Sequence, residues 1–429
     1  MIRRLITTAS LSAVSAMASR GALFAGVLAT AHYLGPTAFG QFTLIQTTAL
    51  LFTTFCALSL GQMATKIVAE AVAQDHSRVS AALTVSYGSA LLASLLFSAL
   101  LLACSYPLAV KVGGSAELTG VYAASSLLVL TGFLGAVQNG VALALHKVKQ
   151  QAIANIVTAP LVFAIMVLAA LQRDITWAIW GSIAAQWLIV LGQERVLRRY
   201  RREHGEPLAW SSTQRGDWSV VWRLGLPSSV SGLLTMPSIW LSMAMLSHSA
   251  NGATQLGNFA VGNQARSILL FGMGVVANAT LPLLSSAIVR GARAETSTTL
   301  RHSIALLVVT TAAIAGVLAM LVPLLIARYA PIYAHAVEPL QWLLLSAVAT
   351  APTTILMRKA TADGRPSVLL AGNAVFSLAL LGATSVALQM HTGATGVAIA
   401  YVIASCLQLA TFTLYNHREL RWSGAPESN

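Results

Sequence analysis

Apolar stretches recur along the whole chain and are separated by short polar segments. A helix needs roughly 20 mainly apolar residues to cross the hydrocarbon core of a membrane. In lipid such stretches must be helical, because a helix satisfies its own backbone hydrogen bonds. The pattern therefore predicts about twelve transmembrane helices, near residues 5–31, 41–64, 83–105, 119–144, 152–171, 175–194, 220–246, 258–288, 304–327, 339–357, 367–389 and 394–415.

The basic residues fix the orientation of these predicted helices. If the N-terminus is cytoplasmic, 21 of the 26 lysines and arginines fall in cytoplasmic segments and only Lys111, Arg173 and Arg328 lie outside. Membrane proteins concentrate lysine and arginine in their cytoplasmic loops. We therefore expect an inner-membrane, multi-pass protein with both termini in the cytoplasm. The same distribution explains the net charge of +13 and argues against nucleic acid as a partner.

The longest predicted cytoplasmic segment divides the chain into two sets of six helices. It is rich in arginine and could touch anionic membrane lipids, although a solvated linker explains it as well. The predicted fold class is all-α integral membrane, with two six-helix bundles around a central cavity. The predicted domains are an N-terminal bundle, a basic cytoplasmic linker and a C-terminal bundle, at residues 1–194, 195–219 and 220–429.

Two short similarities suggest that the bundles are internal repeats. Gly40-Gln41-Phe42 opens the second predicted helix, and Gly257-Asn258-Phe259 opens the eighth; Asn155 and Asn373 also occupy matching helices. An interval of six helices predicts parallel repeats related by an axis along the membrane normal, and transporters often bind substrate where such repeats meet.

The N-terminus has features of a secretory signal, with Arg3 and Arg4 before an apolar run and Ala16-Met17-Ala18 as a cleavage-like site. Because the apolar run continues through residues 21–31, we expect it to be retained as the first membrane helix. The three cysteines lie in apolar runs without Cys-x-x-Cys spacing, and no Ser/His/Asp array or phosphate-binding glycine loop is present. The sequence thus predicts no metal, no cofactor and no enzyme active site.

Two arginines fall within predicted membrane helices, whereas no acidic residue falls near the middle of one. Arg20 lies about 22 Å along its helix from Leu5, at 1.5 Å per residue, and Arg266 lies within the eighth helix. A central arginine costs roughly 2.5–3.5 kcal/mol on insertion scales and usually faces a partner or a water-filled cavity. Guanidinium groups bind phosphate through paired hydrogen bonds. We interpret both as candidate binding residues for an anionic substrate; the alternative is that they reach an interface or bond backbone carbonyls.

Amide side chains accompany these arginines within the predicted helices. They could line a cavity and bond a sugar, or they could bridge helices at about 0.6 kcal/mol each. The sequence does not separate these two roles. The amides taken as candidate substrate-binding residues are Gln138, Asn139, Asn263 and Gln264.

The segment from His32 to Leu44 carries a Leu-Gly-Pro-x-x-Phe-Gly pattern at the junction of the first two predicted helices. This pattern resembles the first external turn of O-antigen-type polysaccharide-biosynthesis flippases. These flippases belong to the multidrug/oligosaccharidyl-lipid/polysaccharide exporter superfamily. The motif is moderately specific, and the twelve-helix architecture extends the resemblance over the whole chain.

The resemblance implies a transporter of an oligosaccharide carried on undecaprenyl pyrophosphate. It would move this lipid-linked substrate from the cytoplasmic to the periplasmic leaflet by alternating access, in O-antigen, capsule or exopolysaccharide synthesis. A partner glycan polymerase is a further possibility. Lipid II flippases of the superfamily typically have two more helices, which argues against a lipid II flippase here.

Two alternatives to a flippase stay open. A cation-coupled multidrug efflux pump usually carries a membrane-embedded acidic residue, and the sequence shows none near the middle of a predicted helix. A membrane glycan polymerase or ligase would be expected to build its site on larger external loops than these. The glycan, the energy source and the oligomeric state are not encoded in any recognisable motif.

Overall fold

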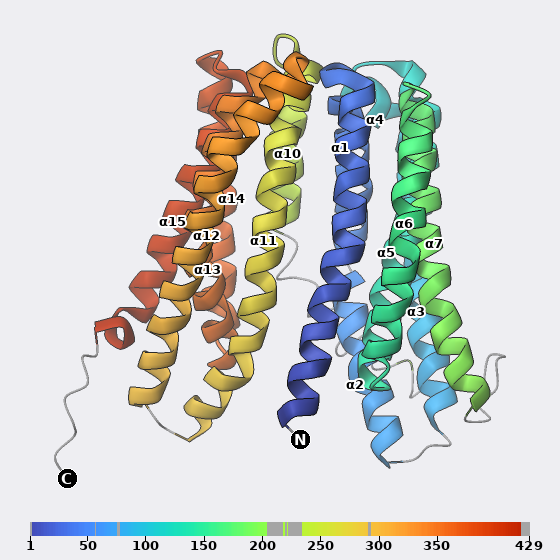
Figure 1. The fold of residues 1–429 in the computed structure, drawn as a ribbon, viewed down its shortest axis with the longest axis vertical. Coiled ribbons are helices and arrows are strands. Elements are labelled where there is room, and N and C mark those ends of the chain that lie inside the picture. The colour runs from blue at the N-terminus through green and yellow to red at the C-terminus, as the bar shows by residue number, and fades with distance from the viewer. Residues whose placement is uncertain are drawn as a thin grey trace. The chain divides into compact units, whose positions relative to one another are not determined.

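The computed structural model describes residues 2–55, 57–74, 78–203, 218, 221, 234–290 and 293–421, and these are almost entirely helical (Figure 1). The described helices fall into two series along the chain. The first comprises α1 (Ile2–Thr54), α2 (Ala57–Gln74), α3 (Val79–Ala103), α4 (Ser105–Lys111), η2 (Ala116–Leu118), α5 (Thr119–Ala144), α6 (Val148–Ala170) and α7 (Ile175–Glu203). The second comprises α10 (Thr235–Ser247), α11 (Gly252–Val289), α12 (Arg293–Tyr329), η5 (Pro331–Ala336), α13 (Val337–Ala362), α14 (Pro366–Gln389) and α15 (Gly393–Arg421).

Nine helices of the described part are long and apolar enough to cross a membrane. The predicted all-α membrane class is therefore confirmed. The predicted helix at 41–64 is not continuous, because α1 ends at Thr54 and α2 begins at Ala57. The first part of the predicted helix at 220–246, apart from residue 221, lies outside the described residues, which resume at 234. The predicted helix at 258–288 corresponds to α11, which is longer at its N-terminal end.

The chain divides into two compact units, and the first helix contributes to both. Unit 1 contains residues 1–34 and 41–236, and unit 2 contains residues 35–40 and 237–429. The predicted linker at 195–219 begins inside a helix, because α7 continues to Glu203. Residues 204–217 lie outside the described part. The boundaries predicted from the sequence stay a prediction.

A kink at Gly35 separates the two helical parts of α1. Gly35 has a φ of 73°, a left-handed value that a glycine adopts without the steric cost of a Cβ atom. Pro36 follows and begins the next helical part, where its missing N–H group is tolerated. The Leu-Gly-Pro signature is therefore a device for reversing the chain between two membrane helices.

Residues 36–40 pack tightly against the start of α11 within unit 2. The Thr37 and Thr254 hydroxyl oxygens lie 2.8 Å apart, and these residues are separated by 217 positions. A methyl group added at Gly40 would overlap the carbonyl oxygen of Ala253, and one added at Gly257 would overlap that of Pro36. Because Gly40 and Pro36 also precede Gly257 and Ala253 by 217 residues, the contact is reciprocal. This local two-fold relation supports the internal repeat.

A second matched pair of contacts supports the same repeat. In unit 1 the Gln193 amide donates to the Asn155 side-chain oxygen at 3.2 Å, which joins α7 to α6. In unit 2 the Gln408 amide donates to the Asn373 side-chain oxygen at 3.2 Å, which joins α15 to α14. The repeat thus preserves an amide pair between the last two helices of each half, partly buried in unit 1 and buried in unit 2.

Candidate functional site

Arg266 is a buried arginine at the junction of three helices of unit 2. It lies on α11, about 21 Å from the start of that helix at 1.5 Å per residue, and its residue is only 6% exposed. Its Nε donates a hydrogen bond to the Ser346 hydroxyl on α13 at 2.8 Å. Its guanidinium carbon lies 5.0 Å from the ring centroid of Tyr401 on α15.

The two partners of Arg266 are themselves held in place. The Ser346 hydroxyl donates to the Leu343 carbonyl at 2.7 Å, so its lone pairs face the arginine. The fully buried Tyr401 ring packs on Phe259 and Phe376, with ring centroids 5.6 and 6.4 Å away. Cation–π attraction reaches about 2 kcal/mol when the groups are desolvated. The guanidinium is therefore fixed in one orientation before any ligand arrives.

Of the Arg266 guanidinium nitrogens, only Nε has a hydrogen-bond partner among the described residues. Within the part of the chain that the structure describes, Arg266 forms no ion pair, and its only hydrogen bond uses Nε. A guanidinium carries five N–H donors and presents its outer nitrogens as a fork that matches phosphate or carboxylate oxygens. An uncompensated buried cation is costly, so this arrangement favours an anionic ligand.

Two of the predicted amides lie near Arg266 on the same helix. Asn263 precedes it by one turn and shares its face, since residues three apart on a helix are neighbours; Gln264 lies beside that face. Both residues are half-buried. Among the described residues neither amide side chain makes a hydrogen bond, although the Asn263 carbonyl accepts one from Ser267 at 2.7 Å. Substrate binding by Asn263 and Gln264 stays a prediction.

Arg20 lies on α1 in unit 1, and its side chain is exposed. Arg266 belongs to unit 2. A single cationic cavity formed by Arg20 and Arg266 together stays a prediction.

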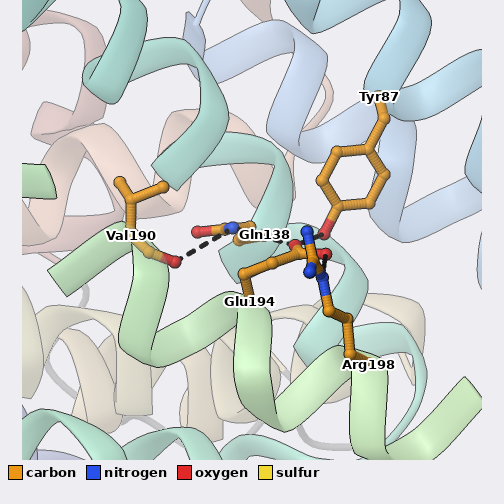
Figure 2. A network of polar contacts seen from close by, with 5 residues as sticks. All are labelled: Tyr87, Gln138, Val190, Glu194 and Arg198. Carbon is orange, nitrogen blue, oxygen red and sulfur yellow. Dashed lines mark hydrogen bonds and ion pairs between the residues drawn. The ribbon is translucent and has the colours of Figure 1, made fainter. Parts of the chain in front are cut away.

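The other two predicted amides lie on α5 and contact neighbouring helices of unit 1. The buried Gln138 amide donates to the Val190 carbonyl and to Glu194 Oε2, each at 3.2 Å (Figure 2). The exposed Asn139 accepts a hydrogen bond from Gln151 of α6 at 2.6 Å. Gln138 thus makes the helix-bridging contacts that the sequence left as its alternative role, and substrate binding by either amide stays a prediction.

Comparison with known families then identifies the chain. The model of the family described as "Polysaccharide biosynthesis protein" matches residues 6–288, more than half of the sequence. The chain belongs to this family. The family that the Leu-Gly-Pro signature indicated is therefore confirmed.

Curated relatives and solved structures extend this family assignment. The chain is 26% identical over 404 residues to the EPS I polysaccharide export inner membrane protein EpsE of Ralstonia solanacearum, covering 93% of this chain and 91% of the relative. The same protein from Ralstonia nicotianae is 25% identical over 409 residues, with the same coverage. A multidrug resistance MATE family transporter of the MOP superfamily, in its inward-facing conformation, matches with a TM-score of 0.80 at 15% identity, over 96% of this chain and 98% of that one.

A MOP superfamily transporter from Pyrococcus furiosus shares the fold with a TM-score of 0.69 at 15% identity, over 96% of this chain and 95% of that one. At these identities the solved structures show the fold alone. Together with the apolar helices, they make this family member a multi-pass membrane protein. Among the described residues, no group of three histidine, cysteine or acidic side chains is placed to hold a metal ion.

Glu194 is a polar centre that sequence reasoning missed. Its carboxylate accepts hydrogen bonds from the Tyr87 hydroxyl at 3.2 Å, from Gln138, and from Arg198 Nε at 3.0 Å (Figure 2). The sequence placed Glu194 at the end of a predicted membrane helix, but α7 continues nine residues further, to Glu203. The i,i+4 spacing of Glu194 and Arg198 was the available signal. Tyr87 and Gln138 are distant from Glu194 in the sequence, so no spacing pattern indicated that they contact it.

Replacing Glu194 with alanine is expected to destabilise unit 1. The change removes the shared acceptor of Tyr87, Gln138 and Arg198, and three such bonds at about 0.6 kcal/mol each give a loss of about 2 kcal/mol. Thermal unfolding of the purified protein measures this loss. Glu203→Ala is the matched control, because Glu203 lies on the same helix and forms an ion pair with the exposed Arg199. Equal unfolding temperatures for the two variants would contradict a structural role for Glu194.

Proposed function

We propose that this protein moves an oligosaccharide carried on undecaprenyl pyrophosphate from the cytoplasmic to the periplasmic leaflet of the inner membrane by alternating access. The observation that carries the proposal is the buried, preorganised Arg266, whose terminal donors form no hydrogen bond with the described residues. Membership of the polysaccharide biosynthesis family supports a glycan substrate. The name of the Ralstonia relative supports export across the inner membrane.

The chemistry of Arg266 fits a pyrophosphate better than a neutral or cationic compound. A phosphate group can accept two parallel hydrogen bonds from the outer guanidinium nitrogens while Nε stays on Ser346. Burial strengthens this attraction, because the pair is shielded from water. A cationic drug would meet repulsion at the same position. The charge of the site therefore supports a substrate that carries a pyrophosphate group.

The candidate amides would recognise the sugar part of the substrate. Asn263 and Gln264 combine donor and acceptor groups near Arg266, which suits hydroxyl-rich ligands. We propose that Arg20 and Asn139 add contacts from unit 1, and that Gln138 contributes by positioning α5 through Glu194. Weak, shared hydrogen bonds of this kind permit binding without preventing release.

The proposed orientation has both termini in the cytoplasm, because 21 of 26 basic residues then lie on that side. The bundles at 1–194 and 220–429 would surround a central cavity, with residues 195–219 as the connection between them. A glycan polymerase acting on the far side of the membrane is the partner that would consume the transported product. The flippase itself would break no covalent bond.

Deletion of the gene in its host tests the proposed function. We expect loss of the surface glycan and accumulation of its lipid-linked precursor in the cytoplasmic leaflet, with both restored by the intact gene. Accessibility of the precursor to an externally added glycosidase in spheroplasts measures its leaflet. Normal glycan with increased sensitivity to cationic drugs would favour an efflux pump instead. Glycosidic bond formation by the purified protein in vesicles would show a polymerase or ligase.

A further inference from the structure

A groove between α6 and α7 combines basic and apolar walls at one end of unit 1. Its volume is about 570 Å³, and its lining includes Lys147, Arg195, Arg199 and Glu203 beside Ile153 and Val157. The two helices form an antiparallel hairpin, so the start of α6 and the end of α7 lie at the same end. All lining residues belong to unit 1.

The basic side chains give the polar end of this groove a positive charge. Arg199 donates to Glu203 at 2.9 Å, and this pair is neutral as a whole. Arg195 forms no ion pair with any described residue, and Lys147 lies 5.0 Å from the ring centroid of the buried Tyr200, which holds it against the groove. Among the described residues, Lys147 and Arg195 therefore have no acidic partner beside the groove.

The start of α6 adds backbone donors to these charges. The helix begins after Lys147 without a side-chain cap, and its first turn contains no acidic residue. The first N–H groups of a helix lack intrahelical partners and attract anions, with the helix dipole contributing in the same direction. A phosphate at this end would meet the backbone donors of α6 and the side chains of Lys147 and Arg195 together.

The other wall of the groove continues into an apolar stripe on α6. Ile153, Val157 and Leu161 are 48, 65 and 56% exposed and lie one turn apart on a single face. The stripe from Ile153 to Leu161 is about 12 Å long at 1.5 Å per residue. This approaches half of the roughly 30 Å hydrocarbon thickness of a bilayer, so its length matches an acyl chain of one leaflet.

We propose that this groove is a binding site for an anionic phospholipid. The phosphate lies between Lys147, Arg195 and the start of α6, and one acyl chain follows Ile153, Val157 and Leu161. A phosphodiester carries a single negative charge, which Lys147 and Arg195 can neutralise. In the orientation proposed above, the lipid belongs to the cytoplasmic leaflet. This site is separate from Arg266 and does not depend on the transported substrate.

The test compares two double variants of the full-length purified protein. Lys147→Gln/Arg195→Gln removes the two positive charges of the groove that form no ion pair with a described residue. Lys149→Gln/Arg202→Gln is the matched control, because it removes one charge near the start of α6 and one near the end of α7, both exposed and outside the groove. Native mass spectrometry measures binding of phosphatidylglycerol, and of phosphatidylcholine with the same acyl chains.

We expect the groove variant to bind phosphatidylglycerol about 30-fold more weakly, since each basic residue contributes about 1 kcal/mol to attraction of an anionic headgroup. The control should bind within twofold of the wild type, and phosphatidylcholine should bind weakly to all three. Equal losses of phosphatidylglycerol binding in the two double variants would contradict the proposed site. Equal binding of the two lipids to the wild type would contradict it as well.

Two further measurements separate the remaining explanations. Val157→Glu places a negative charge on the apolar wall and should also weaken phosphatidylglycerol binding, which tests the groove without removing any basic residue. Undecaprenyl phosphate is offered in competition with phosphatidylglycerol. If it displaces the phospholipid at tenfold lower concentration and the groove variant abolishes this, the occupant is the carrier lipid and the phospholipid proposal is wrong.

Discussion

Replacing Arg266 with alanine is expected to abolish glycan export while the protein still folds and inserts. Export should fall at least 100-fold, because the variant loses both the charge and the paired donors that would hold a pyrophosphate. Surface glycan in a deletion strain carrying the variant measures export. Thermal unfolding and the amount of protein in the membrane measure folding.

The expected stability of this variant follows from opposing contributions. Removing a central arginine recovers roughly 2.5–3.5 kcal/mol of insertion cost. The change also removes a hydrogen bond to Ser346, worth about 0.6 kcal/mol, and a cation–π contact with Tyr401, worth about 2 kcal/mol when desolvated. These contributions nearly cancel, so stability should change by less than about 1 kcal/mol. An arginine with a purely structural role would show a large loss of stability instead.

Two further variants sharpen the interpretation of Arg266. Lysine at this position keeps the charge without the paired donors, so partial export is expected. Arg290→Ala is the control for loss of a positive charge, because Arg290 is an exposed residue just beyond α11 that pairs with Glu295. Normal surface glycan with Arg266→Ala at normal protein level would contradict the anionic site.

Replacing Gly257 with alanine is expected to destabilise unit 2 by about 3 kcal/mol, the upper end of the cost of overpacking. The new methyl group would overlap the carbonyl oxygen of Pro36 and crowd its Cα atom, and backbone cannot move aside as a flexible side chain can. The Thr37–Thr254 hydrogen bond should be lost as the segments separate. Thermal unfolding of the purified variant measures the effect.

Gly274→Ala is the matched control for this substitution. Gly274 lies on the same helix, and a methyl group added there would meet no atom within 4 Å. Alanine should be neutral or slightly stabilising at that position, since it favours a helix by about 1 kcal/mol over glycine. Gly40→Ala, the repeat partner of Gly257, should reproduce the loss. A neutral Gly257→Ala variant would show that the close contact does not contribute to stability.

These close contacts give the Leu-Gly-Pro-x-x-Phe-Gly signature a physical meaning. Gly35 supplies the positive φ of the turn, and Gly40 permits the approach to α11. Phe39 is fully buried and packs edge-on against Tyr333, with ring centroids 6.4 Å apart. The sequence offered the motif only as a resemblance. The structure shows that its residues fasten the turn of α1 to the beginning of the second repeat.

The sequence by itself determined the features that depend on the solvent around each segment. A membrane helix must be apolar over its whole length, so hydrophobic runs alone predicted the helical class. The two repeats were visible because equivalent positions, such as Asn155 and Asn373, keep the same residue type. Arg266 could also be identified from the sequence, because a charged residue inside an apolar run is costly and therefore rare.

Only the tertiary structure decided which side chains meet. Ser346 and Tyr401 lie far along the chain from Arg266, and nothing in the local pattern marks them as its partners. The same holds for Tyr87 and Gln138 at Glu194. Contacts between helices depend on how those helices rotate and pack, whereas hydropathy records only the average environment of each one. The sequence could therefore place a charge in the membrane, but packing determined what holds it there.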